Sequence, residues 1–267
     1  KTRLISRACI SSRRSMSNAQ IEQLRKSVEQ EPNNAAFCNN LGQALHASGQ
    51  WQEARTWFSR ALKLDQNLST AWVNLGIACL DTNDLKTACE AFARAVSINP
   101  KDATAIQYFM HVFSLVNFEV FSDWIKNVLI FCLKFEQVGH QMMSRPWCNY
   151  LGLDSSFLPL RRYHGTGPLP EGLDDPYLLL GLQRMYICSM GFEGIMTSLR
   201  KTFLMDEKTI KGHEDFIISL ATQCWLNEYI YAKTQEESER LGELKAAIEK
   251  KISATPKYMT QLCLYAC

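Results

Sequence analysis

Two adjacent stretches, AAFCNNLGQALHASGQWQEARTWFSRALKLDQNL at Ala35–Leu68 and STAWVNLGIACLDTNDLKTACEAFARAVSINPKD at Ser69–Asp102, align with each other without a gap. The period is 34 residues, and Asn-Leu-Gly recurs at the same place in both copies, at residues 40–42 and 74–76. Self-similarity at a fixed period of this length is typical of repeat proteins, in which each unit packs only against its neighbours. This repeat therefore decides the fold of the first part of the chain.

The spacing of small and large residues predicts two antiparallel helices in each copy, at 35–48 and 52–64 and then at 69–82 and 86–97. Small residues let the paired helices approach closely, and large apolar residues fill the space between them. The matching positions are Gly42 and Gly76, Ala54 and Ala88, Ala61 and Ala95, Leu41 and Leu75, and Phe58 and Phe92. Trp72 fits a core position, and Pro100 ends the second repeat because it cannot continue a helix.

The pattern resembles the tetratricopeptide repeat (TPR) family. That resemblance implies an all-α fold in which helical hairpins stack into an α-solenoid. A lone helix at 21–31 precedes the two full repeats at 35–68 and 69–102, and a helix at 103–115 opens like a third repeat. A repeat array needs about three units to be stable. The TPR region is therefore predicted to span residues 21–115.

The remainder of the chain is also predicted to be helical, without a repeat. Residues 116–153 form a helical extension, residues 154–175 form a linker rich in Pro and Gly, and residues 176–267 form a helical C-terminal region. Asp175 and Pro176 read as the N-cap and first residue of a helix, and Thr234 and Glu237 read as a capping box. Predicted helices lie at 119–135, 140–151, 177–188, 192–205, 213–232 and 234–252, with a last one from Thr255 to the chain end.

The second half resembles the helical region that precedes the catalytic domain in bacterial fusions of TPRs with an S-adenosylmethionine-dependent methyltransferase. The likeness rests on Asp-Pro-Tyr-Leu-Leu-Leu at residues 175–180 and on the Gln-Cys-x-x-Asn-Glu-Tyr pattern at 223–229. The last helix keeps its apolar face up to Cys267. It is either an ordinary C-terminal helix or the end of a truncated region.

Residues that could carry out chemistry are scattered. Gly165-Thr166-Gly167 lacks the preceding strand and following helix of a cofactor loop. Cys263 and Cys267 have no second pair to complete a zinc site, and the five histidines show no metal-ligand spacing. The sequence therefore predicts no catalytic residues, no cofactor, no metal and no enzymatic activity.

Composition limits the kinds of partner that the protein is expected to bind. The formal net charge is +2, which gives no electrostatic case for nucleic acid, and no run approaches the ~20 apolar residues of a membrane span.

The cysteines and the N-terminal residues bear on the cellular compartment. Ten scattered cysteines suggest reduced thiols and a cytoplasmic protein. Residues 1–20 are a basic tail without acids, disordered or targeting. Residues 1–15 are either a mitochondrial transit peptide or sequence upstream of a start at Met16. The oligomeric state stays open.

Two hypotheses for function remain. The first is a non-catalytic module that binds a protein, as a peptide or a partner helix, in the concave groove of its TPRs. In TPRs of the O-GlcNAc transferase type, asparagines just before Leu-Gly grip a peptide backbone. The resemblance implies this role for Asn40 and Asn74; the alternative is that they merely satisfy neighbouring backbone groups. The second hypothesis is the regulatory or substrate-recruiting N-terminal half of a TPR-containing methyltransferase whose catalytic domain is absent. The residues predicted to share the binding face are Asn39, Asn40, Gln43, His46, Thr70, Val73, Asn74, Ile77 and Asp81.

Overall fold

The computed structural model describes residues 18–135, 140–185, 187, 190–226 and 234–252. Every regular element among these residues is a helix, which confirms the all-α fold. The chain divides between Val116 and Asn117 into two compact units. Among the described helices, none combines the length with the apolar character that a membrane crossing requires.

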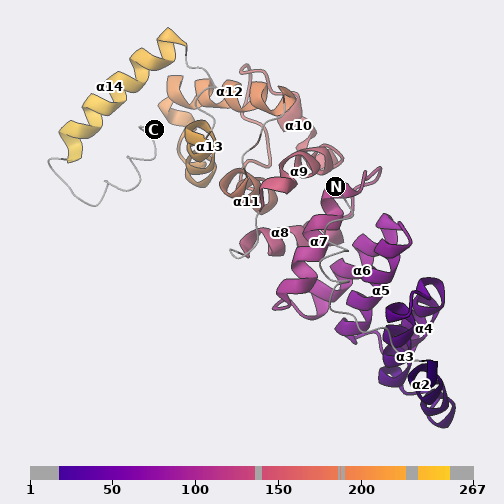
Figure 1. The fold of residues 1–267 in the computed structure, drawn as a ribbon. Helices are drawn as coiled ribbons and strands as arrows, with labels where there is room; N and C mark the ends of the chain where they lie inside the picture. Colours follow the sequence, from indigo (N-terminus) through magenta and orange to yellow (C-terminus); the bar gives the residue numbers. More distant parts are fainter. Residues whose placement is uncertain (1–17, 136–139, 186, 188–189, 227–233, 253–267) are drawn as a thin grey trace. The chain divides into compact units, whose positions relative to one another are not determined.

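The first unit consists of helices that pack in chain order (Figure 1). They are α2 (Asn18–Gln30), α3 (Ala35–Ala47), α4 (Trp51–Leu64), α5 (Ser69–Asp81), α6 (Leu85–Ile98) and α7 (Ala103–Leu115). The helical hairpins α3–α4 and α5–α6 are the two predicted repeats, with ends within one residue of those expected. The α7 helix has the predicted ends, whereas α2 begins three residues before the expected start at residue 21.

The turns inside the two hairpins are equivalent. Gly49 between α3 and α4 has a φ of 85°, and Asn83, 34 residues later, has a φ of 58°. Glycine and asparagine are the residues that adopt this left-handed conformation most readily. The Asp84 side chain then accepts a hydrogen bond from the Thr87 backbone and caps α6. The repeat is thus preserved in the backbone of the turn as well as in the core.

The conserved spacing of the repeat reflects close contact between paired helices. Gly42 on α3 faces the ring of Phe58 on α4, and Gly76 on α5 faces the ring of Phe92 on α6. Both rings are buried. A Cβ atom added at Gly76 would lie 2.7 Å from Cζ of Phe92, which is closer than atoms can pack. The predicted role of these glycines in close helix approach is confirmed.

Replacing Gly76 by Ala is expected to lower the free energy of unfolding by about 1–2 kcal/mol. Overpacking costs ~1–3 kcal/mol of stability, and the higher helix propensity of alanine offsets part of that cost. Hydrogen exchange of α5 and α6 during a urea titration measures the change. The control is Gly194→Ala on the exposed face of α12 (Met190–Met205), where an added Cβ meets nothing within 4 Å and stability should stay equal or rise. Equal effects of the two variants would contradict the packing argument.

The second unit is helical without a repeat. Its elements are α8 (Asp123–Lys134), η1 (Gln141–Met143), α9 (Ser144–Leu151), η2 (Ser155–Phe157), α10 (Leu158–Arg161), α11 (Pro176–Arg184), α12 (Met190–Met205), η3 (Glu207–Thr209), α13 (Glu214–Leu226) and α14 (Gln235–Ile252). The α11 helix packs against both α8 and α13. The core includes the fully buried side chains of Trp147, Tyr150, Phe157, Tyr177 and Phe216.

Two segments of this unit differ from expectation. Residues 119–122 are not helical, because the Tyr150 hydroxyl donates to the Ser122 carbonyl and accepts from the Ser122 amide, both at 2.9 Å, in extended backbone. The segment 154–175, which the sequence suggests as a linker, contains η2 and α10. Its Phe157, Leu160 and Leu173 are buried within the second unit. Proline and glycine there shape tight turns between packed side chains.

The helix starts in the second unit follow local sequence rules. Asp175 caps α11 by accepting a hydrogen bond from the Tyr177 backbone at 2.8 Å, with Pro176 in the first turn. Thr234 and Glu237 form the predicted capping box through two backbone-to-side-chain hydrogen bonds. Predictions for the tail before residue 18, for residues 227–232, and for the helix and cysteines after residue 252 lie outside the described residues.

Candidate protein-interaction face

The first helices of the two repeats, α3 and α5, lie next to each other and carry the nine residues of the predicted binding face. Two hydrogen bonds join the helices. Asn74 donates from its side-chain amide to the side-chain oxygen of Asn39 at 3.0 Å. Nε2 of His46 lies 2.6 Å from a carboxylate oxygen of Asp81 and donates to it. Both bonds join residues 35 apart in the chain, so the repeat itself sets this register.

The structure separates the nine residues into two groups. Asn39 and His46 are buried, with 6% and 8% of their surfaces exposed, and they hold α3 against α5. The side chains of Asn40, Gln43 and Thr70 are exposed, and the other four residues are half-buried. The exposed and half-buried residues form what we call the α3–α5 face: Asn40, Gln43, Thr70, Val73, Asn74, Ile77 and Asp81.

The two asparagines that the repeat aligns are not equivalent in the structure. Asn74 uses one amide hydrogen on Asn39 and keeps its carbonyl oxygen for another donor. Asn40 is exposed and has no hydrogen-bond partner among the described residues. The sequence could not distinguish them, because the bond to Asn74 comes from Asn39, one position earlier. Within the part of the chain that the structure describes, neither asparagine side chain bonds to a backbone group.

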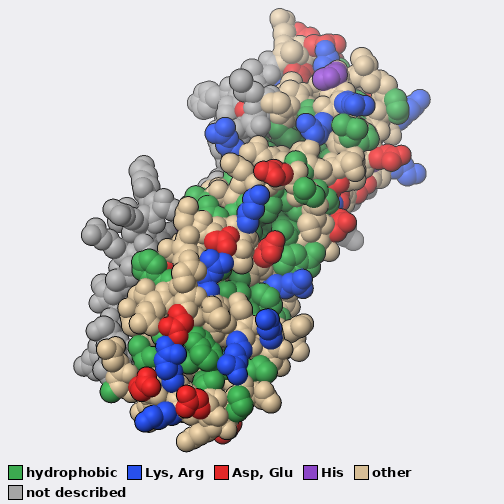
Figure 2. Space-filling view, turned by 90° about the vertical axis from the view of Figure 1, so that its right-hand side faces the viewer, with side chains coloured by type: hydrophobic (Ala, Val, Ile, Leu, Met, Phe, Trp, Pro, Cys, Tyr) green, Lys and Arg blue, Asp and Glu red, His purple; other side chains and the backbone are tan. Residues whose placement is uncertain are grey.

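The α3–α5 face is polar but almost uncharged. Asp81 is its one acidic residue, it contains no lysine or arginine, and the Asp81 carboxylate is already bonded to His46. Three of its seven residues carry side-chain amides, and each amide offers both a donor and an acceptor. On the side of the protein shown in Figure 2, basic and acidic side chains are interspersed rather than gathered by sign. The chemistry of the α3–α5 face suits neutral polar groups such as peptide units.

The buried polar groups of the second unit have structural partners. The Arg200 guanidinium on α12 donates to both carboxylate oxygens of Glu237, at 3.1 and 3.2 Å, and Glu237 also closes the capping box of α14. Gln223, which opens the Gln-Cys pattern on α13, is fully buried and donates to the carbonyl oxygens of Leu182 and Met185. These bonds hold α12 to α14 and α11 to α13.

Burial disfavours the thiolate form of four cysteines among the described residues. Burial raises the pKa of the Cys79 thiol to about 11 and the pKa values of Cys89 and Cys132 to about 12, so these thiols stay protonated near neutral pH. Cys38 is buried too, and its pKa is raised for the same reason. Across the described parts of the chain, His, Cys, Asp and Glu form no cluster of three that could hold a metal ion.

One match among known protein families agrees with the repeat geometry: residues 33–101 match the family model of the tetratricopeptide repeat. DnaJ homolog subfamily C member 7 from Mus musculus is 26% identical over 98 residues, which is 37% of this chain and 20% of that protein. The chain thus spans about one fifth of the length of that curated relative. A solved structure of YrrB, a TPR protein with an unusual peptide-binding site, has 15% identity and a TM-score of 0.36 over 91% of this chain and 97% of its own.

The repeat, the hairpin geometry and the family match agree on this part of the chain. Residues 33–101 form tetratricopeptide repeats, and a second helical unit follows them in the chain.

Proposed function

We propose that this protein is a non-catalytic interaction module that holds an extended peptide on the α3–α5 face. The observation that carries this proposal is the exposed amide of Asn40 next to Gln43 and the half-used amide of Asn74. An extended peptide presents a donor and an acceptor at every residue, spaced about 3.3–3.6 Å per residue. Amide side chains on two adjacent helices can pair with such a backbone without requiring a particular side chain.

Rigidity of the face supports the same proposal. Binding costs less when the recognising groups are already held in place. The Asn39–Asn74 and His46–Asp81 bonds fix α3 and α5 in one register, and Asn39 and His46 are buried beneath the exposed amides. The neutral character of the α3–α5 face favours backbone recognition over the capture of a charged chain end.

Replacing both Asn40 and Asn74 by Ala is expected to weaken peptide binding by about 10- to 100-fold. Each lost amide contact is worth ~0.5–1.5 kcal/mol. The probe is a peptide selected on the wild-type chain from a random dodecapeptide display library, and fluorescence anisotropy of the labelled peptide gives the dissociation constant.

The matched control for that experiment is Asn127→Ala, an exposed asparagine on α8 of the second unit, which should leave affinity unchanged. Asn40→Ala should lose no more than ~1 kcal/mol of stability. Asn74→Ala also leaves the buried Asn39 oxygen without its donor and should cost ~1–3 kcal/mol, so the single variant Asn40→Ala separates lost binding from lost stability. Unchanged affinity in the double variant, or failure of the library to yield any binder, would remove the α3–α5 face from the proposal.

The methyltransferase hypothesis has weaker support. Its motif at residues 223–229 begins with Gln223, whose burial and bonds to Leu182 and Met185 already explain that residue as a packing element. The intact mass of the native protein, captured with an antibody to residues 234–252, separates the two functions. An additional domain of ~20 kDa or more would favour the methyltransferase reading.

A further inference from the structure

A groove of about 510 Å³ lies in the first unit, away from the α3–α5 face. The α5 helix packs against both α4 and α6, so the first turns of α5 form the floor between the ends of those two helices. We call this the Trp72 groove. Its lining residues are Ser59, Leu62, Lys63, Gln66, Asn67, Trp72, Leu75, Arg94, Ser97 and Ile98.

The floor of the Trp72 groove is apolar and held in place. Trp72 is half-buried rather than enclosed in the core as its repeat position suggests. Its indole nitrogen donates to the Gln66 carbonyl at 2.8 Å, which fixes the ring and satisfies its only polar atom. Leu62 and Leu75 complete the floor with most of their surfaces covered. A fixed tryptophan beside aliphatic side chains is the kind of surface that receives an apolar anchor residue.

The walls of the Trp72 groove carry charge of one sign. Lys63 at the end of α4 and Arg94 on α6 are both exposed, and no acidic residue lines the groove. Two exposed acids lie outside the lining: Asp65, next to Gln66 in the chain, and Glu90, one helical turn before Arg94 on α6. Residues 18–116 as a whole hold eight Lys and Arg against nine Asp and Glu, a formal charge of −1. The positive groove is therefore a local feature of a slightly acidic unit.

The Trp72 groove and the α3–α5 face use opposite sides of one helix. At 100° per residue along α5, Trp72 and Leu75 fall on one side, and Val73, Asn74 and Ile77 fall on the other. The two sets share no residue. Each surface can therefore be occupied or mutated independently of the other.

From this arrangement we propose that the Trp72 groove is a second docking site, which takes an acidic peptide segment with a bulky apolar residue between its carboxylates. The apolar residue packs on Trp72, Leu62 and Leu75, and the carboxylates lie towards Lys63 and Arg94. A volume of 510 Å³ is in the range of sites that enclose small ligands or short segments. The net negative charge of the unit disfavours nucleic acid, which requires a broad positive surface.

The test uses three fluorescein-labelled hexapeptides with the same Leu-Phe centre, flanked on each side by two glutamates, two serines or two lysines. The full chain is titrated against each peptide by fluorescence anisotropy at ~50 mM and ~200 mM salt. We expect the glutamate peptide to bind at least tenfold more tightly than the serine peptide, and the lysine peptide to bind most weakly. The preference should shrink at the higher salt concentration, because exposed charges are screened.

Charge reversal locates the site. The double variant Lys63→Glu with Arg94→Glu should bind the glutamate peptide at least tenfold more weakly than the wild-type chain does. It should bind the lysine peptide more tightly. The matched control is Lys26→Glu, an exposed lysine on α2 outside the groove, which should change neither. The Asn40→Ala with Asn74→Ala variant should bind the glutamate peptide normally, so failure of this proposal is distinct from failure of the α3–α5 face.

A benzophenone placed on the peptide identifies the residues that it contacts. Cross-links to residues 59–75 or 94–98 support the Trp72 groove, whereas cross-links elsewhere overturn it. Equal binding of the three peptides overturns the proposal, as does a charge-reversed variant that keeps full affinity for the glutamate peptide. Displacement of the glutamate peptide by a lower concentration of a single-stranded dodecathymidylate would instead assign the groove to nucleic acid.

Discussion

Replacing Arg200 by Ala is expected to lower the free energy of unfolding of the second unit by about 3–5 kcal/mol. The guanidinium makes two bonds to the Glu237 carboxylate, and the two side chains are only 8% and 1% exposed. Removing one partner of a buried ion pair leaves the other charge without compensation in a poorly solvated place. Urea unfolding, with hydrogen exchange reporting α12 and α14, measures the loss.

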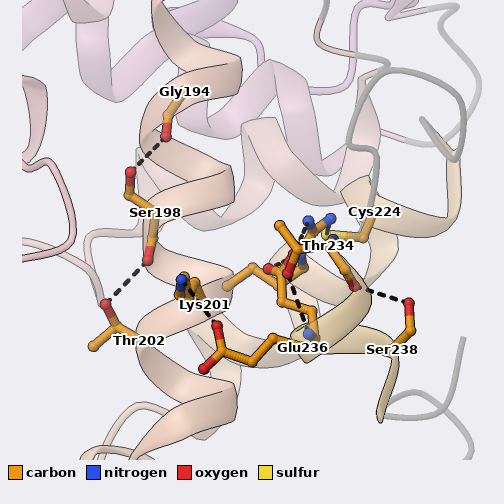
Figure 3. Close-up of polar contacts among 10 residues, drawn as sticks. Gly194, Ser198, Lys201, Thr202, Cys224, Thr234, Glu236 and Ser238 are labelled. Carbon is orange, nitrogen blue, oxygen red and sulfur yellow. Dashed lines mark hydrogen bonds and ion pairs between the residues drawn. The ribbon is translucent and has the colours of Figure 1, made fainter. Parts of the chain in front are cut away.

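The adjacent pair provides the matched control. Lys201 and Glu236 lie 3.3 Å apart but are 52% and 66% exposed (Figure 3). Exposed ion pairs contribute ~0–1 kcal/mol, so Lys201→Ala should cost far less than Arg200→Ala. Replacing both buried partners with apolar residues, as Arg200→Met with Glu237→Leu, should recover part of the lost stability, reduced by the ~0.5–2 kcal/mol of the capping bond from the Thr234 backbone. Similar losses for the two alanine variants would show that burial does not set the strength of the Arg200–Glu237 pair.

The Arg200–Glu237 pair also makes stability depend on pH. Burial alone would raise the pKa of the Glu237 carboxyl, but bonds from the Thr234 backbone and the Arg200 guanidinium outweigh burial and hold it below its usual 4.5. A depressed pKa in the folded state means that this carboxylate stabilises the protein above about pH 4.5. That contribution is lost as the pH falls through the folded-state pKa. The acid-induced loss should be smaller in the Arg200→Ala variant.

Much of the structure of the first unit can be predicted from the sequence, because the 34-residue repeat places the same kinds of residue at equivalent positions of each hairpin. The Asn-Leu-Gly pattern fixes which residues of α3 and α5 face α4 and α6, and the glycines contact Phe58 and Phe92 as expected. Helix starts at Asp175 and Thr234 follow from residues within one turn. These features depend on neighbours close in the chain or on a fixed period, and sequence reports both directly.

Contacts between distant side chains did not follow from sequence. Asn39 and Asn74 were predicted to share a face, but the bond between them depends on the angle at which α3 meets α5. Trp72 occupies a repeat position that suggests a core residue, yet the separation of α4 from α6 leaves it lining a groove. The distance between helices of different hairpins depends on packing over the whole unit, and the pattern of apolar residues in the sequence does not encode that distance.

The Lys126 cluster of the second unit was missed for the same reason. The apolar stripe of α8 predicts a buried helix, and nothing in that stripe identifies its lysine as a core residue. The Lys126 ammonium lies 2.8 Å from the Asp175 carboxylate and 3.2 Å from the Asp154 carboxylate. These acids are 49 and 28 residues away in the chain. One sequence signal could have revealed the cluster: a lysine among the apolar residues of a helix, followed later in the chain by two aspartates that each begin a helix.

Replacing Lys126 by Met is expected to cost about 3–5 kcal/mol of the free energy of unfolding of the second unit. The Lys126 side chain is 13% exposed and Asp154 is 8% exposed, so the variant leaves two facing carboxylates with little solvent. The ammonium also lies 5.0 Å from the ring centre of Phe157 and 5.9 Å from that of Tyr177. Such contacts with aromatic rings add ~0.5–2 kcal/mol when they are desolvated.

The pKa shifts of the Lys126 cluster set the pH range in which its charges stabilise the second unit. Burial alone would lower the pKa of Lys126, but hydrogen bonds to Asp175 and Asp154 outweigh it and raise the pKa above 10.5. Burial alone would raise the pKa of Asp154, but its bonds to Ser156 and Lys126 hold it below 3.8. The stabilisation from Lys126 is thus complete below pH 10.5 and lost as the pH rises through its folded-state pKa. The stabilisation from Asp154 is lost as the pH falls below 3.8.

Two further variants separate lost charge pairing from lost packing at Lys126. Lys126→Met with Asp154→Asn should recover part of the stability, because asparagine removes one unpaired charge yet can still accept the Ser156 hydrogen bond that caps η2. Lys134→Met, at the exposed end of the same helix, should cost less than ~1 kcal/mol. If the double variant is no more stable than Lys126→Met alone, the loss comes from packing around the lysine stem. The aspartates would then act only as caps of η2 and α11, and the cluster would not need its charge.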